Sequence, residues 1–407
     1  MSGRVPLGVL DLVPVSSGST AGEALRNTVD LSQQVEEAGY ERYWFAEHHL
    51  NPGVAGSSPA VLIALIAGAT QRIRLGSGGV QSGHRTALSV VEEFGLIDSL
   101  YPGRLDLGLG RSGGRDFFRD RLAGAPGAKA SSGPKADPGR HFTGNGLLIP
   151  ERPSLSHLVN SPRVAVTAEL LQQAEARSAD YGELLHDIVG LLRGSYRSTD
   201  GLDPRPVPGQ GAAVELWVLG SSAGQSAAVA GELGLRFAAN YHVSPATVLE
   251  AVDAYRNAFV PSAELERPHV AVSADVVVAA DDATAKELAS GYGLWVRSIR
   301  KGLGAIEFPT PQQAARHEWT DEDRRLVADR VDTQFVGSPE TVVSHLELLR
   351  DATDADELAI TTITHDHADR VRSYRLLANE WHRDPESVRH KGESRIPAEK
   401  ERAAHAS

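Results

Sequence analysis

Three ionisable side chains, Glu47, His48 and His49, directly follow the apolar run Tyr43-Trp44-Phe45-Ala46. Such a run is typical of a buried strand, so the three groups come at the strand's carboxyl end. In α/β proteins, binding and catalysis take place at the carboxyl ends of the parallel strands. Histidine titrates near neutral pH and can act as a general base or hydrogen-bond donor, so we expect this turn to carry the chemistry.

The same histidines could bind a metal ion, together with the run His365-Asp366-His367. Metal-dependent hydrolase barrels place a His-x-His sequence at the end of the first strand. Here the first expected strand ends in Asp11-Leu12-Val13-Pro14. We therefore predict that the protein holds no metal, and a metal-dependent hydrolase remains the minor alternative.

Two motifs are suited to bind an anion. Gly220-Ser221-Ser222 precedes an expected helix, where backbone N–H groups, the helix dipole and two hydroxyls could face a phosphate. A simple serine N-cap explains the same pattern. Arg111, followed by the flexible Ser112-Gly113-Gly114, comes after the neighbouring strand and could contact the same phosphate. Together the motifs indicate a phosphorylated cofactor, whereas Gly108-Leu109-Gly110 lies inside an expected strand and indicates no dinucleotide-binding turn.

Glycines end the third expected strand, in the run Gly76-Ser77-Gly78-Gly79 before Val80. They remove side chains either where a large group approaches the backbone or where a barrel strand bends. Both explanations stay open. Further polar groups at expected strand ends are predicted to face the same pocket; they are Asp11, Tyr241, His242 and His365.

Strand-like and helix-like segments alternate along most of the chain. The expected strands are 5–12, 41–46, 73–80, 104–110, 214–219, 235–239, 270–279 and 357–362. The expected helices are 21–38, 57–70, 87–100, 164–192, 223–233, 245–259, 282–299, 339–349 and 368–381. Eight strands, each followed by helix, predict the α/β fold class and a TIM (β/α)8 barrel, formed by residues 1–382 as a single domain.

Three segments depart from this alternation. Residues 111–162 are rich in Gly, Pro, Ala and Ser, and we expect a long insertion after the fourth strand that could form a lid. An irregular, charged segment is expected between residues 300 and 338. The charged residues 383–407 show no periodicity and predict a mobile tail.

Composition excludes several functions. The 407 residues carry a formal net charge of −12 without a basic block, so neither nucleic acid nor an anionic membrane is an expected partner. The chain has no cysteine, which rules out disulfides, thiolate metal sites and a cysteine nucleophile. It lacks an apolar run of the roughly 18 to 20 residues that span a membrane, and its start does not read as a signal peptide. We expect a cytoplasmic protein.

Several of these motifs, in this order, resemble the bacterial-luciferase-like family of flavin-dependent monooxygenases. The resemblance covers residues 4–110 and 212–382. The segments that carry it are 42–49, 73–80, 101–111, 219–222, 335–340 and 361–366.

The resemblance implies a usually dimeric TIM barrel that takes reduced FMN from a separate flavin reductase and reacts it with dioxygen. A flavin C4a-peroxide would then attack a small organic substrate such as an aldehyde or ketone. His48 matches the family's catalytic histidine, with Glu47 and His49 as supports that orient it. Gly78 and Gly79, followed by Val80, match the pair that carries a non-prolyl cis peptide under the flavin ring.

The phosphate contacts of the family match Arg111 and the turn of Gly220, Ser221 and Ser222, in agreement with the anion-binding motifs. The chain departs from the family at Gly83-His84-Arg85-Thr86-Ala87, which lacks the expected prolines, and in the insertion. Both segments should shape the substrate pocket. Two alternatives therefore remain: an F420-dependent hydride-transfer enzyme on the same fold, and a non-catalytic flavin-binding barrel.

Overall fold

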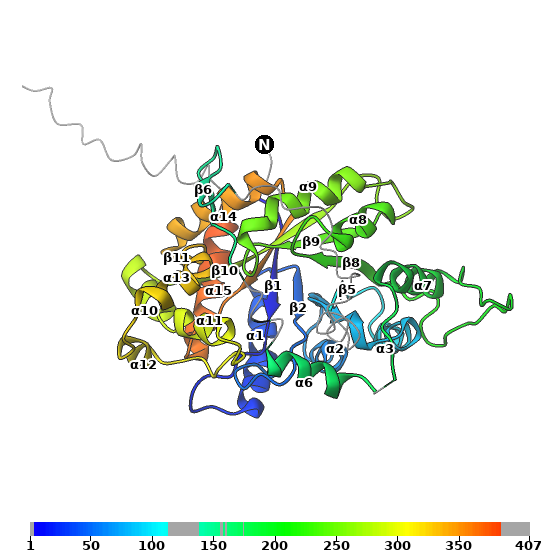
Figure 1. Ribbon diagram of the computed structural model, residues 1–407, viewed down its shortest axis with the longest axis horizontal. Helices are drawn as coiled ribbons and strands as arrows, with labels where there is room; N and C mark the ends of the chain where they lie inside the picture. Colours follow the sequence, from blue (N-terminus) through cyan, green and yellow to red (C-terminus); the bar gives the residue numbers. More distant parts are fainter. Residues whose placement is uncertain (1–3, 113–137, 155–157, 159–160, 174, 384–407) are drawn as a thin grey trace, which may run out of the picture.

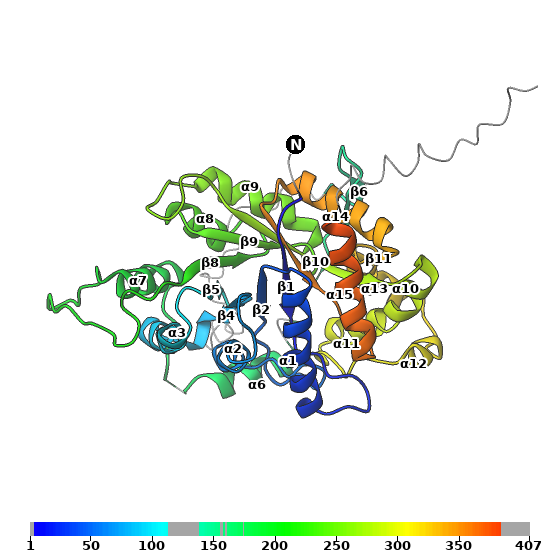
Figure 2. The same ribbon diagram turned by 180° about the vertical axis from the view of Figure 1, so that it is seen from behind.

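Parallel strands form a closed barrel at the centre of the molecule (Figures 1 and 2). The computed structural model describes residues 4–112, 138–154, 158, 161–173 and 175–383. The barrel strands are β1 (Leu7–Asp11), β2 (Arg42–Phe45), β3 (Arg74–Ser77), β5 (Leu105–Gly110), β8 (Glu215–Gly220), β9 (Arg236–Asn240), β10 (Val270–Val278) and β12 (Glu357–Thr361). They pair in this order, and β12 pairs with β1 to close the cycle. The predicted TIM barrel is confirmed.

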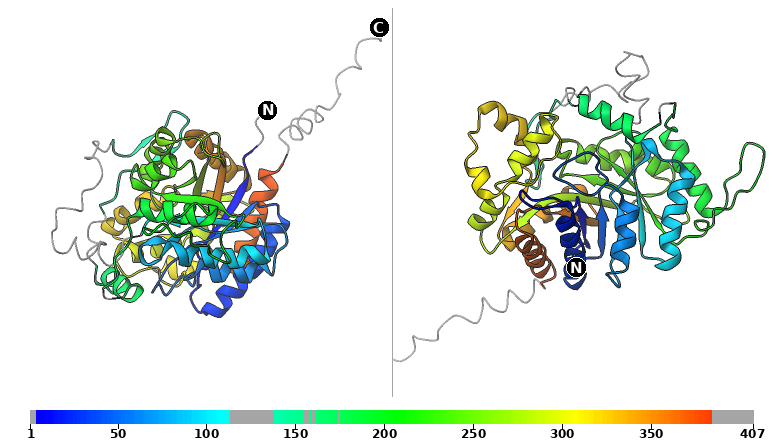
Figure 3. Two further views of the ribbon diagram at one scale, coloured as in Figure 1. Left: turned by 90° about the vertical axis from the view of Figure 1, so that its right-hand side faces the viewer. Right: turned by 90° about the horizontal axis from the view of Figure 1, so that it is seen from below.

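Helices surround the strands (Figure 3). They are α1 (Ala21–Glu37), α2 (Pro59–Ala67), α3 (Ala87–Leu100), α7 (Tyr181–Arg193), α8 (Gln225–Glu232), α9 (Val248–Ala258), α14 (Pro339–Thr353) and α15 (His367–Trp381). Local signals set their starts: Thr20 and Glu23 form a capping box before α1, and Pro59 is the first residue of α2. The main apolar core lies between the strands and these helices, and a second cluster lies inside the barrel.

Two predicted helices are each divided in two. The segment 164–192 forms α6 (Pro162–Leu171) and α7, because Asp180 caps a new helix by accepting hydrogen bonds from the N–H groups of Gly182 and Glu183. The segment 282–299 forms α10 (Asp282–Ala289) and α11 (Tyr292–Arg300), with Ser290 and Gly291 between them. Neither break contains a proline, the strongest signal of a helix end, and the sequence therefore did not reveal them.

The prediction of an irregular segment between residues 300 and 338 is wrong. This stretch contains α12 (Pro311–Ala315), α13 (Asp321–Val331) and β11 (Phe335–Gly337). Thr320 caps α13, whose acidic first turn suits the positive end of a helix. Three of its charged side chains, Asp323, Asp329 and Arg330, are buried and paired. Arg300 on α11, for example, donates to Asp329 at 2.6 Å.

Much of the predicted insertion, 113–137, 155–157 and 159–160, lies outside the described residues, as does the tail beyond Arg383. Its described part contains the hairpin of β6 (His141–Phe142) and β7 (Leu148–Ile149). This hairpin lies beside α14, where Asn145 donates to the carbonyl of Leu348 at 2.8 Å (Figure 1). The lid stays a prediction. Within the described ranges, no helix is long and apolar enough to cross a membrane.

A network of charges closes the end of the barrel at which the strands begin. Asp106 is fully buried and accepts hydrogen bonds from Arg42 at 2.8 Å, from Arg74 at 2.7 Å and from the Trp44 indole at 2.8 Å. Arg42 also pairs with Glu357 at 2.6 Å. These residues belong to β2, β3, β5 and β12, so the network joins four strands and leaves the opposite end for the site.

Candidate functional site

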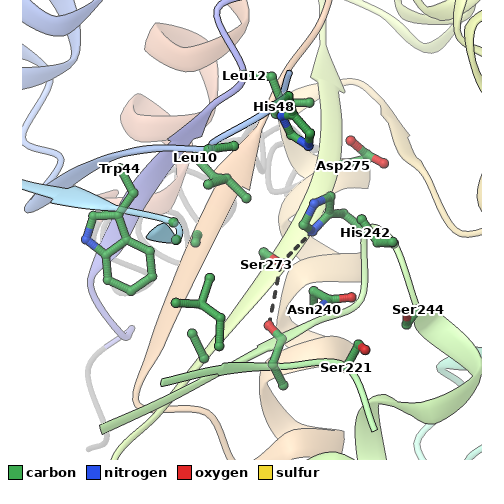
Figure 4. A pocket seen from close by; sticks show the side chains of 18 of the residues that line it. Leu10, Leu12, Trp44, His48, Ser221, Asn240, His242, Ser244, Ser273 and Asp275 are labelled. Carbon is green, nitrogen blue, oxygen red and sulfur yellow. Dashed lines mark hydrogen bonds between the residues drawn. The ribbon is translucent and has the colours of Figure 1, made fainter. Parts of the chain in front are cut away.

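A cavity of about 390 Å³ lies inside the barrel toward the carboxyl ends of the strands (Figure 4). Its volume is within the usual range for small-molecule sites. Most of its wall is apolar, formed by residues such as Leu10, Trp44, Ala238 and Ile363. The polar lining residues come from several strand ends and from two helices; they are Glu47, His48, Ser221, Asn240, His242, Ser244, Ser273, Asp275, Trp295 and Arg330.

His48 projects into this cavity near His242 (Figure 4). Its main-chain N–H donates to the carbonyl of Gly56 at 2.7 Å, which fixes the turn after β2. Burial and the neighbouring His49 lower the pKa of His48 and Glu47 opposes them, with the net result that the pKa is about 4. Its Nδ1 atom is buried and has no hydrogen-bond partner among the described residues. His48 is therefore a neutral imidazole at pH 7 with one ring nitrogen available to a ligand.

Glu47 is the centre of a polar cluster behind His48. One carboxylate oxygen lies 2.9 Å from His49 Nε2 and 3.2 Å from His84 Nε2, and the other accepts from the Gln81 N–H at 2.9 Å. Burial by itself would raise the pKa of Glu47, but the hydrogen bonds from His84, Gln81 and His49 lower it below its ordinary value. Glu47 is thus an anion that holds His49 and the segment after β3 in place.

Glu47, His49 and His84 also resemble a metal-ligand set, because their ligand atoms lie within 4.8 Å of one another. A cation already stands at this carboxylate, since Arg85 Nη2 is 3.9 Å from the same oxygen. The same guanidinium pairs more closely with Glu93, at 2.7 Å, and the Glu47 carboxylate is stabilised mainly by its hydrogen bonds with His84, Gln81 and His49. His365 and His367, the other histidines considered as ligands, contact Ser17 and Asp30 instead.

The opposite wall carries a second set of buried polar groups. His242 Nδ1 lies 2.6 Å from the Ser273 hydroxyl, and burial lowers the pKa of His242 to about 3, with further effects of Arg330 and His48. Asp275 pairs with Arg330 and with the Tyr292 hydroxyl. Burial raises the pKa of Asp275 despite these partners.

Glycines form the floor of the cavity at Gly78 and Gly79, and the peptide bond between them is cis, as expected from the family resemblance. A Cβ atom on Gly78 would lie 2.6 Å from a methyl carbon of Leu10, and one on Gly79 would lie 2.8 Å from the carbonyl oxygen of Gly108. Close approach therefore explains both glycines, and the backbone between them is exposed to whatever fills the cavity.

The anion-binding motifs lie at one corner of the barrel mouth. Ser221 lines the cavity, and Ser222 is exposed next to it. Neither serine caps α8: the helix begins at Gln225 after Gly224, which provides no side-chain cap. The N-cap explanation is therefore wrong, and the first N–H groups of α8 lack a side-chain acceptor.

Arg111 reaches the same corner from β5, although its side chain is exposed. Burial raises the pKa of Tyr181, and a hydrogen bond with Ser226 in the first turn of α8 and the charge of Arg111 partly offset this. Both groups are thus near the Tyr181 hydroxyl. Arg111 and the start of α8 can face one anion.

Some predicted pocket residues do not line the cavity. Asp11 is fully buried on the other side of β1, where it pairs with Arg370 at 2.7 Å and accepts from the Tyr43 hydroxyl. Side chains alternate along a strand, so Leu10 faces the cavity and Asp11 faces the helices. This carboxylate stabilises the packing of α15 on the barrel.

In the turn after β9, Tyr241 points away from the cavity and its hydroxyl donates to the Leu148 carbonyl at 2.6 Å, while His242 lines the cavity. His365 contacts the loop after β1, with Nε2 3.0 Å from the Ser17 carbonyl oxygen. Val80 is buried in β4 (Val80–Gln81) against β5, and Gly220 ends β8 beside Phe237.

Sequence reasoning missed Ser273, Asp275, Trp295 and Arg330 in the cavity wall. A signal existed for two of them: Ala271, Ser273 and Asp275 occupy alternate positions of the otherwise apolar strand β10, and alternate positions share one face. For Arg330 there was none, because it lies in the charged stretch expected to be irregular.

Both histidines of the cavity should make stability depend on pH. Their folded-state pKa values, about 4 for His48 and about 3 for His242, lie below the ordinary value of 6.5. Between these limits the unfolded chain binds more protons, so the free energy of unfolding should fall as the pH is lowered from 6.5, by up to about 1.4 kcal/mol per pH unit for each site.

Urea denaturation between about pH 7 and 4.5 measures this slope. The His48→Gln/His242→Gln double variant is expected to lose the part that the histidines contribute, because glutamine does not titrate. Equal slopes in the two proteins would show that neither histidine has a depressed pKa.

Comparison with known proteins agrees with this architecture. The family model for luciferase-like monooxygenase matches residues 5–129 and 159–356. A luciferase-like monooxygenase of Escherichia coli (strain K12) is 32% identical over 376 residues, which are 91% of this chain and 96% of that protein. N-acetyl-S-alkylcysteine monooxygenase of Bacillus subtilis (strain 168) is 45% identical over 119 residues, covering 29% of this chain and 36% of that protein.

Among solved structures, apo-MsnO8 has a TM-score of 0.72 and 30% sequence identity, with 93% of this chain and 98% of that chain covered. The full-length similarities extend over the barrel and the strand ends that form the cavity. The chain is therefore an enzyme that belongs to the luciferase-like monooxygenase family.

Proposed function

We propose that this enzyme binds reduced FMN in the cavity of Figure 4 and uses dioxygen to oxygenate a small organic substrate, such as an aldehyde or ketone. The name of the Bacillus relative adds S-alkyl thioethers to the substrates to be tested. The flavin, when bound, supplies the oxygen chemistry. The protein's contribution lies in binding, orientation, exclusion of water and control of protons.

One observation carries this proposal. Four lining side chains each have a buried polar atom without a hydrogen-bond partner in the described part of the chain: His48 Nδ1, Asn240 Oδ1, Trp295 Nε1 and Arg330 Nε. Buried polar groups are normally paired, so unpaired ones around a cavity indicate a polar ligand. The edge of a flavin ring presents both acceptors and an N–H donor, which suits this mixture of donors and acceptors.

The corner of Arg111, Ser221 and Ser222 would hold the cofactor phosphate. Uncapped N–H groups at the start of α8 and a guanidinium from the neighbouring strand end are both favourable to an anion. Gly78 and Gly79 would lie against the flavin ring, because they leave the cavity floor without side chains.

His48 would accept or donate the proton that the reaction requires. Its pKa of about 4 keeps it neutral, so one ring nitrogen can accept a proton and the other can donate a hydrogen bond, and after accepting a proton the imidazolium can return it. Glu47 and His49 would act as positioning residues, because they fix the turn that carries His48. The apolar wall around Leu10, Leu12 and Trp44 would keep water from the reacting atoms.

A homodimer and a separate flavin reductase complete the proposal. Helices α2 and α3 lie side by side (Figure 2). Both carry exposed apolar side chains, which a second subunit could cover. They are Val61, Leu65, Leu88, Leu96 and Leu100. A reductase would supply the reduced cofactor.

Oxygen uptake tests the function. With reduced FMN supplied by any flavin reductase, we expect a candidate aldehyde, ketone or thioether to yield a product that carries one oxygen atom from ¹⁸O₂. The F420 alternative predicts the reverse: hydride transfer from reduced F420 to a substrate without oxygen, and no labelled product with FMN.

A further inference from the structure

A second cavity, of about 340 Å³, adjoins the first. His48 and Ile299 line both, so the candidate base stands between the two chambers. The outer wall is α6, which lies across the end of the barrel opposite the N-terminus in Figure 1. The turn after α11, at Gly302 and Gly304, completes the wall.

The lining of this second cavity is amphipathic. One side is apolar, with Val164, Ala168 and Leu171 from α6 and Ile299 from α11. Arg163 is the only lysine or arginine among its described lining residues, and no aspartate or glutamate is present among them. In a protein with a net charge of −12, a cavity of this kind favours an anion over a cation.

Arg163 has most of its hydrogen-bonding capacity free. Its one hydrogen bond within the described residues is long, 3.4 Å from Nη2 to Asn51 Oδ1, and that oxygen already accepts from the Ala305 N–H at 2.9 Å. No carboxylate of the described chain forms an ion pair with it. A guanidinium carries five N–H donors, so it can still bind a carboxylate through two of them.

The guanidinium of Arg163 packs against the backbone of Gly304. A Cβ atom there would lie 2.6 Å from Arg163 Cζ, so the side chain rests directly on the glycine backbone. Asn51 and Gly304 therefore hold the cation in the wall of this cavity, which His48 also lines.

We propose that this second cavity is the substrate chamber and selects amphipathic anions: a carboxylate or similar anionic group pairs with Arg163, and an apolar chain lies along α6 toward His48. The identification of this ligand as the substrate rests on the proposed function, whereas the binding of such an anion does not. Arg163 is then a specificity-determining residue, which positions the ligand rather than reacting with it.

Calorimetric titration of the flavin-free protein tests the proposal with octanoate and octanamide, which share a chain length and differ in charge. We expect the wild type to bind octanoate about 10-fold more tightly, as for a charge-assisted hydrogen bond. Arg163→Gln should remove this preference and Arg163→Lys should keep part of it. Arg177→Gln, which changes an exposed arginine outside the cavity lining, should keep all of it.

The proposal would be overturned by an octanoate preference that is unchanged in Arg163→Gln, or by a wild type that does not bind octanoate. A variant that loses affinity for FMN but binds octanoate normally would also overturn it, because Arg163 would then serve the cofactor phosphate. If the wild type binds octanoate as expected but never binds FMN, the proposed function fails and the anion site stands.

Discussion

Replacement of His48 by glutamine is expected to lower kcat by about 10²- to 10⁴-fold, the usual range for loss of a general acid or base. Glutamine keeps much of the polar volume but cannot accept a proton. Affinity for reduced FMN should change little, because the cavity retains its other polar lining residues. Steady-state oxygen uptake measures kcat, and an anaerobic titration measures the affinity.

The pH profile distinguishes a proton-transfer role from a structural one. A wild-type acid limb near pH 4, where His48 becomes protonated, should be absent from the residual activity of the variant. His382→Gln, an exposed histidine at the end of α15, is the matched control and should have wild-type kcat and profile. An unchanged kcat in His48→Gln would assign the chemistry to another group.

Replacement of Asp106 by alanine should destabilise the fold by about 3 to 5 kcal/mol, the range found when one partner of a buried ion pair is removed. The substitution removes the carboxylate that pairs with both Arg42 and Arg74. Two largely buried positive charges then lie close together with fewer negative charges to offset them. Urea denaturation measures the loss.

Asp351→Ala provides the control for this effect. Asp351 pairs with Arg350 at 2.7 Å, but its side chain is more than half exposed, so the expected loss is within about 1 kcal/mol. Equal losses in the two variants would contradict a structural role for the network at the base of the barrel.

The barrel could be predicted because each of its strands is an apolar run that is followed by a segment with helical periodicity. Eight such strand–helix units are typical of a closed (β/α)8 barrel. Helix breaks were less visible. Asp180 and Gly291 interrupt expected helices at breaks that contain no proline, the strongest signal of a helix end. The charges of α13 concealed a helix, because two of its buried ionised groups, Asp329 and Arg330, pair with groups on α11 and β10.

The site was visible in the sequence where polar residues come directly after a strand, as with His48, Ser221 and His242. The position after a strand does not show which of two neighbouring residues faces the cavity. Asp11 and Tyr241 also lie at strand ends, yet their side chains point away from the cavity. Arg163 on α6 and Arg330 on α13 line the two cavities from helices that are additional to the eight strand–helix units of the barrel. No local sequence pattern marks such residues as cavity-lining.

The most direct test of the account is an anaerobic titration of the purified protein with reduced FMN, followed through the fluorescence of Trp44 and Trp295 in the cavity wall. A flavin bound in this cavity should give saturable quenching with one flavin per chain. Binding should be weaker in Asn240→Leu, which removes a buried acceptor that lacks a partner among the described residues. Absence of quenching up to millimolar reduced FMN, in a protein that is folded, would contradict the assignment of the cavity to a flavin.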